Sequence, residues 1–266
     1  MSLSPFLRAS VALHAVAVPA LAVAPHRWPW IAGALVANHY VTIAGGLLPR
    51  SALLGPNLRR SATAQKAGAV VLTFDDGPDA DVTPGVLDLL DARGAKATFF
   101  CIGEHAARHR ALTEEIAHRG HRLENHSQTH SDAFFFHPPA RLDREIGACQ
   151  EELHRASGRV PSFFRAPAGI RSPLLESALA RAGLRLASWT RRGFDTTSRD
   201  PVAVASRLTR DLSAGDVVLL HDGASQPRSR RAPVVLQALP RVLDAIDAAG
   251  LRAMPLMDDL AEPPRV

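Results

Sequence analysis

The chain has 266 residues, of which 46% are hydrophobic and 21% are charged, a composition typical of a globular protein rather than a disordered one. Its formal net charge is +5, but the basic residues are interspersed with acids, as at Arg144–Glu145, which argues against a nucleic-acid-binding surface. The two cysteines, Cys101 and Cys149, are too few for a disulfide framework or a cysteine-rich metal site, so we expect free thiols.

Residues 1–54 are predicted to be a membrane anchor made of two hydrophobic helices. Residues 28–48 contain no Lys, Arg, Asp or Glu and are long enough to span a hydrocarbon core of about 30 Å. Residues 9–25 are the weaker candidate, because a histidine and a proline interrupt the apolar run. A tight turn at Pro25–Arg27 would join the two helices into a hairpin.

This segment has two interpretations, which differ in topology. A signal peptide would use Arg8 as its basic region and Ala20-Leu21-Ala22 as its cleavage site. A hairpin would instead place five basic residues on one side of the membrane against Arg27 on the other. The positive-inside rule then predicts a protein of the inner (cytoplasmic) membrane whose main domain faces the cytoplasm, with an outward-facing domain as the alternative.

Residues 55–67 are predicted to be a linker, because Gly55, Pro56 and Asn57 interrupt the apolar pattern. Residues 68–258 are predicted to form one domain, and residues 259–266 a tail. Short apolar runs in the domain predict strands at 69–74, 97–102, 121–124, 162–165, 184–189, 216–220 and 251–254.

Amphipathic segments separate most of these strands. The first predicted helix begins with Thr83 as its N-cap and ends at Gly94. The other predicted helices cover residues 105–119, 139–157, 173–182, 201–213 and 233–249. Strands that alternate with helices form parallel sheets, so we predict an α/β fold, a distorted (β/α)7-8 barrel preceded by the hydrophobic helical segment. An open doubly wound sheet is the alternative.

Polar residues follow five of the predicted strands. They are Asp75 and Asp76, His126 and His130, Arg165, Asp195, and His221. In β/α barrels the functional site forms where the strands end, so we expect these side chains to converge.

The spacing of His126 and His130 would put both imidazoles on one face of a helical turn. Together with one carboxylate of the Asp75–Asp76 pair, they would form a two-histidine, one-carboxylate site for a divalent metal with open positions for water and substrate. The other aspartate could then take a proton from the activated water.

His221 ends a buried strand, where it is placed to protonate a leaving amine. Arg165 ends an apolar run and needs an anionic partner, which a catalytic aspartate would supply. The turn after Arg165 could point a backbone N–H at a developing oxyanion. An acid, a base and a metal ion together are the groups needed to hydrolyse the bond to an acyl group.

The chain resembles the polysaccharide deacetylases with the NodB homology domain, carbohydrate esterase family 4. The resemblance covers roughly residues 69–256 and is carried by four motifs in the family's order. They are Thr-Phe-Asp-Asp-Gly at 73–77, His-Ser-x-x-His at 126–130, Arg-x-Pro-x-Gly at 165–169 and Leu-x-His at 219–221.

The resemblance implies a role for each matching position. Asp75 would be the general base, oriented by Arg165. One divalent metal ion, usually zinc in this family, would be held by Asp76, His126 and His130.

The remaining roles concern the acid and the substrate. His221 would be the acid, tuned by Asp195. The backbone N–H of Ala168 would bind the oxyanion, Leu219 would line the acetyl pocket, and Trp189 would contact substrate.

Three departures from the family's pattern affect the substrate-binding surface. Ala168 stands where the family usually has Tyr, Arg192 replaces the first aspartate of the fourth motif, and Thr196 replaces its final tryptophan. These changes spare the hydrolytic residues but remove rings that stack on sugars.

The resemblance implies a hydrolase of carbon–nitrogen bonds that removes N-acetyl groups from an amino sugar of an envelope polysaccharide or a lipid-linked glycan. The anchor raises the hypothesis of a lipid-linked substrate beside that of a polymer, as would Phe134-Phe135-Phe136 if these rings form an apolar lip rather than pack on the domain. The alternatives are an N-deformylase or O-acetyl esterase acting on a lipid-linked sugar, or an inactive glycan-binding membrane protein.

Overall fold

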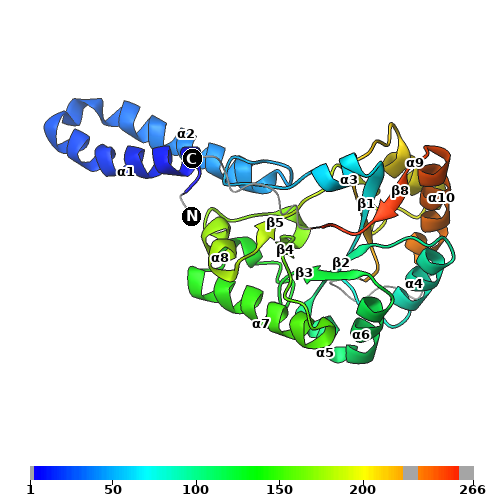
Figure 1. Ribbon diagram of the computed structural model, residues 1–266. Coiled ribbons are helices and arrows are strands. Elements are labelled where there is room, and N and C mark those ends of the chain that lie inside the picture. Colours follow the sequence, from blue (N-terminus) through cyan, green and yellow to red (C-terminus); the bar gives the residue numbers. More distant parts are fainter. Residues whose placement is uncertain (1–2, 224–232, 258–266) are drawn as a thin grey trace.

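The computed structural model describes residues 3–223 and 233–257, so the expected tail at 259–266 lies outside the described residues. An α/β domain carries a helical hairpin that projects from one side (Figure 1). The hairpin consists of α1 (Pro5–Val23) and α2 (Trp28–Leu47), joined by a 3-10 turn at Pro25–Arg27. The Asn38 amide donates a hydrogen bond of 2.8 Å to the Ser10 hydroxyl and links the two helices.

Within the described residues, α1 alone is both long and apolar enough to cross a membrane, with a mean hydropathy of 1.8. Membrane anchors and signal sequences both meet this criterion. The sequence favours residues 28–48 as the better spanning segment because they carry no charged residue, whereas the hydropathy criterion selects α1. This expectation is therefore not confirmed.

The domain is built on a parallel sheet of eight strands in the order β5-β4-β3-β2-β1-β7-β6, with β8 pairing with the start of β1. The strands are β1 (Ala69–Asp75), β2 (Thr98–Cys101), β3 (Arg122–Asn125), β4 (Phe163–Phe164), β5 (Arg185–Leu186), β6 (Arg191–Arg192), β7 (Val217–His221) and β8 (Arg252–Met254). The sheet curls into a half-barrel, which confirms the predicted distorted barrel. The predicted strand at 184–189 is shorter, and β6 was missed because two arginines carry no strand signal.

Helices cover the outside of the sheet. They are α3 (Ala62–Lys66), α4 (Thr83–Asp91), α5 (Gly103–Arg108), α6 (Arg110–His118), α7 (Pro139–Ser157), α8 (Leu175–Ala182), α9 (Pro201–Thr209) and α10 (Val234–Ala248). The helix predicted at 105–119 is two helices, because the backbone leaves the helical region at His109, with φ −115° and ψ 48°. Thr83 is not an N-cap, since its hydroxyl is bonded to the buried carboxylate of Asp222 at 2.7 Å.

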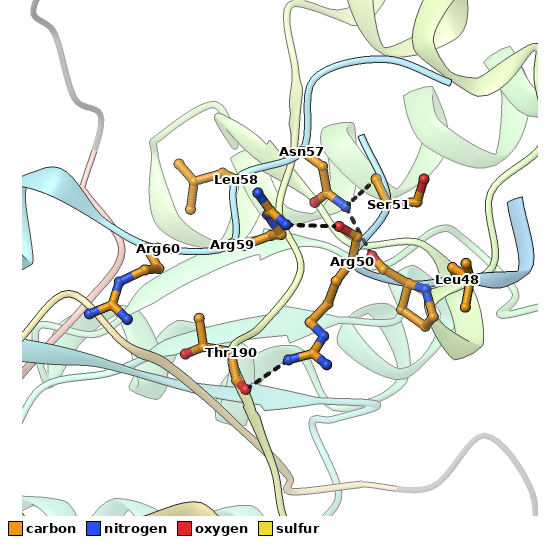
Figure 2. A pocket seen from close by; sticks show the side chains of 9 residues that line it. Leu48, Arg50, Ser51, Asn57, Leu58, Arg59, Arg60 and Thr190 are labelled. Atoms are coloured by element: carbon orange, nitrogen blue, oxygen red, sulfur yellow. Dashed lines mark hydrogen bonds between the residues drawn. The ribbon is translucent and has the colours of Figure 1, made fainter. Parts of the chain in front are cut away.

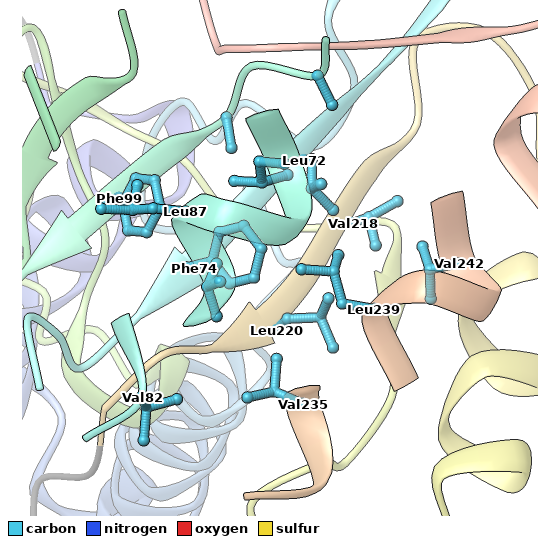
Figure 3. Packing of buried hydrophobic residues seen from close by; sticks show 14 of the residues in the cluster. Leu72, Phe74, Val82, Leu87, Phe99, Val218, Leu220, Val235, Leu239 and Val242 are labelled. Carbon is cyan, nitrogen blue, oxygen red and sulfur yellow. The ribbon is translucent and has the colours of Figure 1, made fainter. Parts of the chain in front are cut away.

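The alternation of side chains along each strand divides the core in two. On β1, Leu72 and Phe74 face the helices, where they pack beside Val218 and Leu220 of β7 (Figure 3). The residues between them point into the barrel, among them Val71. Because successive residues of a strand point to opposite faces, Thr73 and Asp75 share the inner face with Val71.

The segment expected to be a linker, residues 55–67, contains α3 and packs on the domain. Leu58 forms a parallel bridge with Ala187, which follows β5. Arg60 forms an antiparallel bridge with Asp216, which precedes β7, and an ion pair of 3.0 Å with its buried carboxylate. The segment therefore connects the β5 end of the curled sheet to the β7 side.

The hairpin is fixed to the domain where α2 ends. The backbone N–H of Arg171 donates to the carbonyl of Gly46 at 3.0 Å, and a Cβ at Gly46 would lie 2.8 Å from the ring of Phe135. Of the other two rings, Phe134 is buried and Phe136 is 81% exposed. The Phe134–Phe136 segment thus both packs on the domain and presents one ring to the surroundings.

We expect Leu72→Ala to destabilise the fold strongly, because Leu72 is fully buried between the sheet and the helices. We expect the free energy of unfolding to fall by about 2–5 kcal/mol. The measurement is urea unfolding of the full-length protein in detergent, followed by circular dichroism. Val160→Ala, at an exposed position, is the control, and an equal loss in both variants would contradict this core assignment.

Candidate metal centre and catalytic pocket

One cavity of about 190 Å³ opens at the ends of the strands and gathers most of the residues singled out in the sequence. Its lining includes Asp75, Asp76, His126, His130, Ala168, Trp189, Leu219 and His221. Arg165 and Asp195 lie behind the lining, hydrogen-bonded to Asp75 and His221, respectively. The predicted convergence is therefore observed.

Backbone geometry turns the carboxylate and imidazole groups toward each other. Asp75 faces inward by strand alternation, and Asp76 bends back because its φ is 71°. His126 and His130 lie on a loop rather than on a helical turn, so that expectation is wrong. Positive φ values at Ser127 (65°) and His130 (49°) fold the loop so that both imidazoles meet Asp76.

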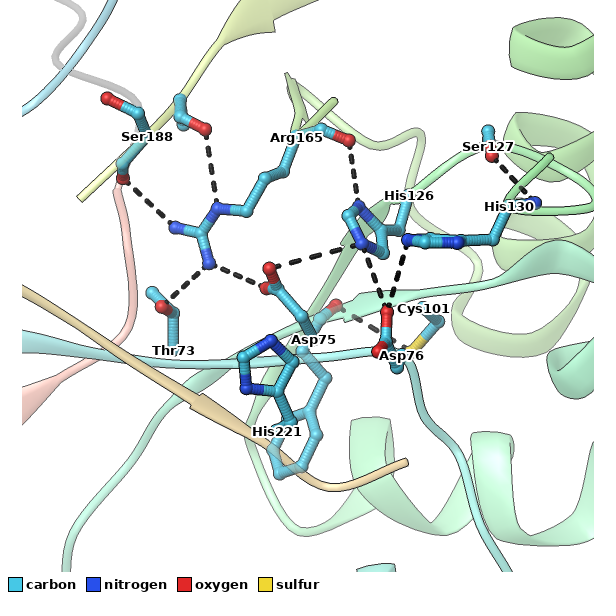
Figure 4. A network of polar contacts seen from close by, with 12 residues as sticks. Thr73, Asp75, Asp76, Cys101, His126, Ser127, His130, Arg165, Ser188 and His221 are labelled. Atoms are coloured by element: carbon cyan, nitrogen blue, oxygen red, sulfur yellow. Dashed lines mark hydrogen bonds and ion pairs between the residues drawn. The ribbon is translucent and has the colours of Figure 1, made fainter. Parts of the chain in front are cut away.

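Three potential metal ligands converge at this point (Figure 4). Asp76 Oδ1 lies 3.3 Å from His126 Nε2 and 3.5 Å from His130 Nε2, and one ligand atom from each residue falls within 4.8 Å of the others. The Nδ1 of His126 is 2.8 Å from the carbonyl oxygen of Arg165. Since a carbonyl only accepts, Nδ1 carries the proton and Nε2 is left with a lone pair.

The electrostatics of this cluster favour a cation at its centre. Burial raises the pKa of Asp76, but the hydrogen bond and positive charge of a protonated His126 outweigh it and hold the pKa below its usual range, and a metal ion would supply the same positive charge beside neutral imidazoles. Burial and the neighbouring His126 lower the pKa of His130, which favours the neutral, ligating imidazole. The donor set of two imidazoles and one carboxylate fits a divalent ion such as zinc.

A buried ion pair orients Asp75. Its Oδ1 accepts a hydrogen bond of 2.6 Å from Arg165, which leaves Oδ2 facing His126 Nε2 at 4.0 Å. Burial lowers the pKa of Arg165, and the charge of Asp75 opposes that shift. The guanidinium also donates to Thr73 Oγ1 at 2.9 Å and lies 4.0 Å from the centre of the Phe100 ring.

The opposite wall holds a histidine–aspartate pair. His221 Nδ1 lies 2.9 Å from Asp195 Oδ1, and its backbone N–H donates to Asp195 Oδ2 at 2.8 Å. Burial lowers the pKa of His221, but the hydrogen bond and charge of Asp195 outweigh it and raise the pKa to about 8. With Nδ1 engaged by Asp195, Nε2 of His221 is the nitrogen free to deliver a proton.

The remaining predicted residues border the same space. Ala168 has a φ of 54°, and its N–H makes no backbone hydrogen bond to residues 3–223 or 233–257. Leu219 and Trp189 are almost fully buried and form part of the wall. The two substituted positions, Arg192 and Thr196, also line the cavity.

Two supporting residues were not singled out from the sequence. Thr73 stands two residues before Asp75 and so shares its face of β1, a signal that strand alternation could have revealed. His105 lies on α5, and its Nδ1 is 2.8 Å from the carbonyl oxygen of Asp76. Nothing in the sequence around His105 indicates this contact, because it joins positions 29 residues apart.

Comparisons with known proteins agree with this geometry. The sequence model of the family described as polysaccharide deacetylase matches residues 62–187. A chitooligosaccharide deacetylase of Bradyrhizobium sp. (strain ANU 289) is 30% identical over 71% of this chain and 89% of that protein. A peptidoglycan-N-acetylglucosamine deacetylase of Bacillus cereus is 31% identical over 65% of this chain and 81% of that protein.

Solved structures give the same picture. A family 4 carbohydrate esterase from Streptomyces lividans, in complex with acetate, is 32% identical and aligns with a TM-score of 0.63. The alignment covers 70% of this chain and 91% of that one.

The ligand cluster predicts that His126→Ala weakens zinc binding. Loss of a residue that hydrogen-bonds a metal ligand typically weakens metal affinity roughly 10- to 100-fold. Loss of the ligand itself should weaken zinc affinity by more than that. Isothermal titration of the metal-free, full-length protein with zinc measures the change. His118→Ala, at an exposed position on α6, is the control, and an unchanged affinity in His126→Ala would refute the ligand assignment.

Proposed function

This chain belongs to the polysaccharide deacetylase family and is a hydrolase of that family, and from that premise we propose that it removes N-acetyl groups from an amino sugar of an envelope polysaccharide or lipid-linked glycan. The observation that supports this most strongly is the placement of Asp75 and His221 on opposite sides of one cavity, next to the cluster formed by Asp76, His126 and His130.

The proposed reaction begins with proton removal from water. Arg165 occupies Oδ1 of Asp75, so Oδ2 is the oxygen available as a base. Asp75 would take a proton from a water molecule as that water attacks the acetyl carbonyl. The N–H of Ala168 is free to stabilise the charge that develops on the carbonyl oxygen.

Collapse of the tetrahedral species requires a proton on the leaving nitrogen. The Nε2 of His221 would donate it, while Asp195 stabilises the imidazolium. The carbon–nitrogen bond then breaks, and acetic acid and a free amine leave. The proton taken up by Asp75 replaces the one that His221 donated, so both residues return to their starting states.

A divalent ion, which we propose to be zinc, would lower the pKa of bound water toward about 7 and polarise the carbonyl. Asp76, His126 and His130 are the residues that would hold it. The hydrogen bond from His126 Nδ1 to Arg165 keeps that ligand in the correct tautomer.

We also propose how the chain is organised at the membrane. Residues 1–54 would anchor a catalytic domain of residues 68–258 at the inner membrane, and the distribution of basic residues favours the cytoplasmic face. The apolar, mostly exposed α1 supports the anchor.

Asp75→Asn should reduce acetate release by about 100- to 10,000-fold, because an amide cannot accept the proton of water. Bound metal should stay near the wild-type content, since Asp75 is not in the ligand cluster. Acetate released from N-acetyl chitooligosaccharides is quantified by enzymatic assay or chromatography. Asp81→Asn, an exposed carboxylate on the following loop, is the control, and full activity of Asp75→Asn would disprove the mechanism.

The His221–Asp195 pair predicts the alkaline limb of the pH profile. The acid must be protonated, and the pKa of His221 is raised to about 8, so kcat/KM should fall as the pH rises past that value. Asp195→Asn removes the charge that raises this pKa, so the limb should move to lower pH. Measured kcat/KM profiles would contradict the pairing if the limb stayed in place or moved upward.

A further inference from the structure

An arginine without an acidic partner borders the catalytic cavity. The guanidinium carbon of Arg192 lies 5.4 Å from the centre of the Trp189 ring and 4.9 Å from that of Phe194. Its Nε is buried without a hydrogen bond, and it makes no ion pair with the described residues. A guanidinium in such a position is suited to bind an anionic group of a ligand.

A second, larger cavity of about 960 Å³ lies where α2 meets the domain, and it too is basic. Figure 2 shows its arginines, Arg50, Arg59 and Arg60. Arg60 is neutralised by Asp216, whereas Arg50 and Arg59 donate long bonds of 3.4 Å to the carbonyls of Thr190 and Arg50. No acidic residue of the described chain lines this cavity.

The two cavities are lined by neighbouring residues of the chain. Trp189 lines the catalytic cavity, and the next residue, Thr190, lines the second. Pro49 of the second cavity contacts the catalytic loop, since a Cβ at Gly169 would lie 2.8 Å from Pro49 and 2.6 Å from the Trp189 ring. A ligand that extends from the reacting centre past Trp189 and Pro49 would therefore approach the second cavity.

The second cavity also lies next to the end of the apolar hairpin. Leu48, which directly follows α2, is one of the residues that line the second cavity. The hairpin of α1 and α2 exposes many of its apolar side chains. If the hairpin is embedded in a bilayer, Arg50 and Arg59 lie at the boundary between lipid and domain. Basic side chains at this boundary attract anionic headgroups.

We propose that the substrate is an N-acetyl amino sugar whose anomeric carbon is esterified to a lipid phosphate, an inference that rests on the proposed function. In a 2-acetamido sugar, the acetamido carbon C2 and the anomeric carbon C1 are adjacent. When the acetamido group lies between Asp75 and His221, the phosphate on C1 is placed toward Arg192. Arg50 and Arg59 add positive charge beside the path by which the lipid chain leaves. Hydrolysis breaks the amide bond and leaves the phosphate ester intact.

Three probes of increasing complexity test this proposal with the full-length, zinc-loaded protein in detergent. They are N,N′-diacetylchitobiose, N-acetylglucosamine 1-phosphate and a polyprenyl phosphate ester of N-acetylglucosamine. We expect the highest kcat/KM for the polyprenyl ester. The ratio of its kcat/KM to that of chitobiose should fall about 10- to 100-fold in Arg192→Gln and also fall in Arg50→Gln.

Arg155→Gln removes an exposed arginine of α7 that pairs with Glu152, and this control should leave the ratio unchanged. Equal efficiency on chitobiose and the polyprenyl ester would overturn the inference while leaving the proposed deacetylase function intact. An ester preference that both arginine variants preserve would overturn the assignment of these residues. Equal rates on the soluble 1-phosphate and the ester would reject the lipid, and acetate release from no probe would refute the proposed function itself.

Discussion

The buried pair of Arg165 and Asp75 is the interaction on which the geometry of the site depends. Arg165 is 1% exposed, and its guanidinium is bonded to Asp75, to Thr73 and to the carbonyls of Ala187 and Ser188. Its own carbonyl fixes His126. Removing one member of a buried ion pair typically costs about 3–5 kcal/mol because the other charge is left uncompensated. Stability and the geometry of the cavity thus depend on the same residue, which joins Asp75, the proposed base, to the cluster of Asp76, His126 and His130.

Regular alternation along the strands made much of the site predictable from the sequence. Once 69–74 and 216–220 are recognised as strands, the inward positions fall at Asp75 and His221, and parallel pairing aligns the two residues directly. The four family motifs supplied the partners from β3 and β4. The distorted barrel followed from the same alternation of apolar runs and helices.

What the sequence concealed depends on backbone conformation and on long-range packing. The loop carrying His126 and His130 has left-handed backbone at Ser127 and His130, and this conformation is too uncommon in residues with a side chain to be assigned from the sequence. The break at His109 and the contact of His105 with Asp76 arise from tertiary packing. Which of α1 and α2 is the better spanning helix is likewise not fixed by the sequence, because absence of charge favours α2 and the hydropathy criterion favours α1.

The bridging segment of residues 58–61 has a practical consequence for studying the domain in isolation. The family match begins at residue 62, so a truncated protein designed on that boundary would lose Leu58 and Arg60. Asp216, which is fully buried, would retain Arg191 but lose its second guanidinium, and the edge beside Ala187 would lose its backbone partner. An unpaired strand edge promotes aggregation. A version without the hairpin should therefore start upstream of Leu58, so that both backbone bridges and the second guanidinium on Asp216 are kept.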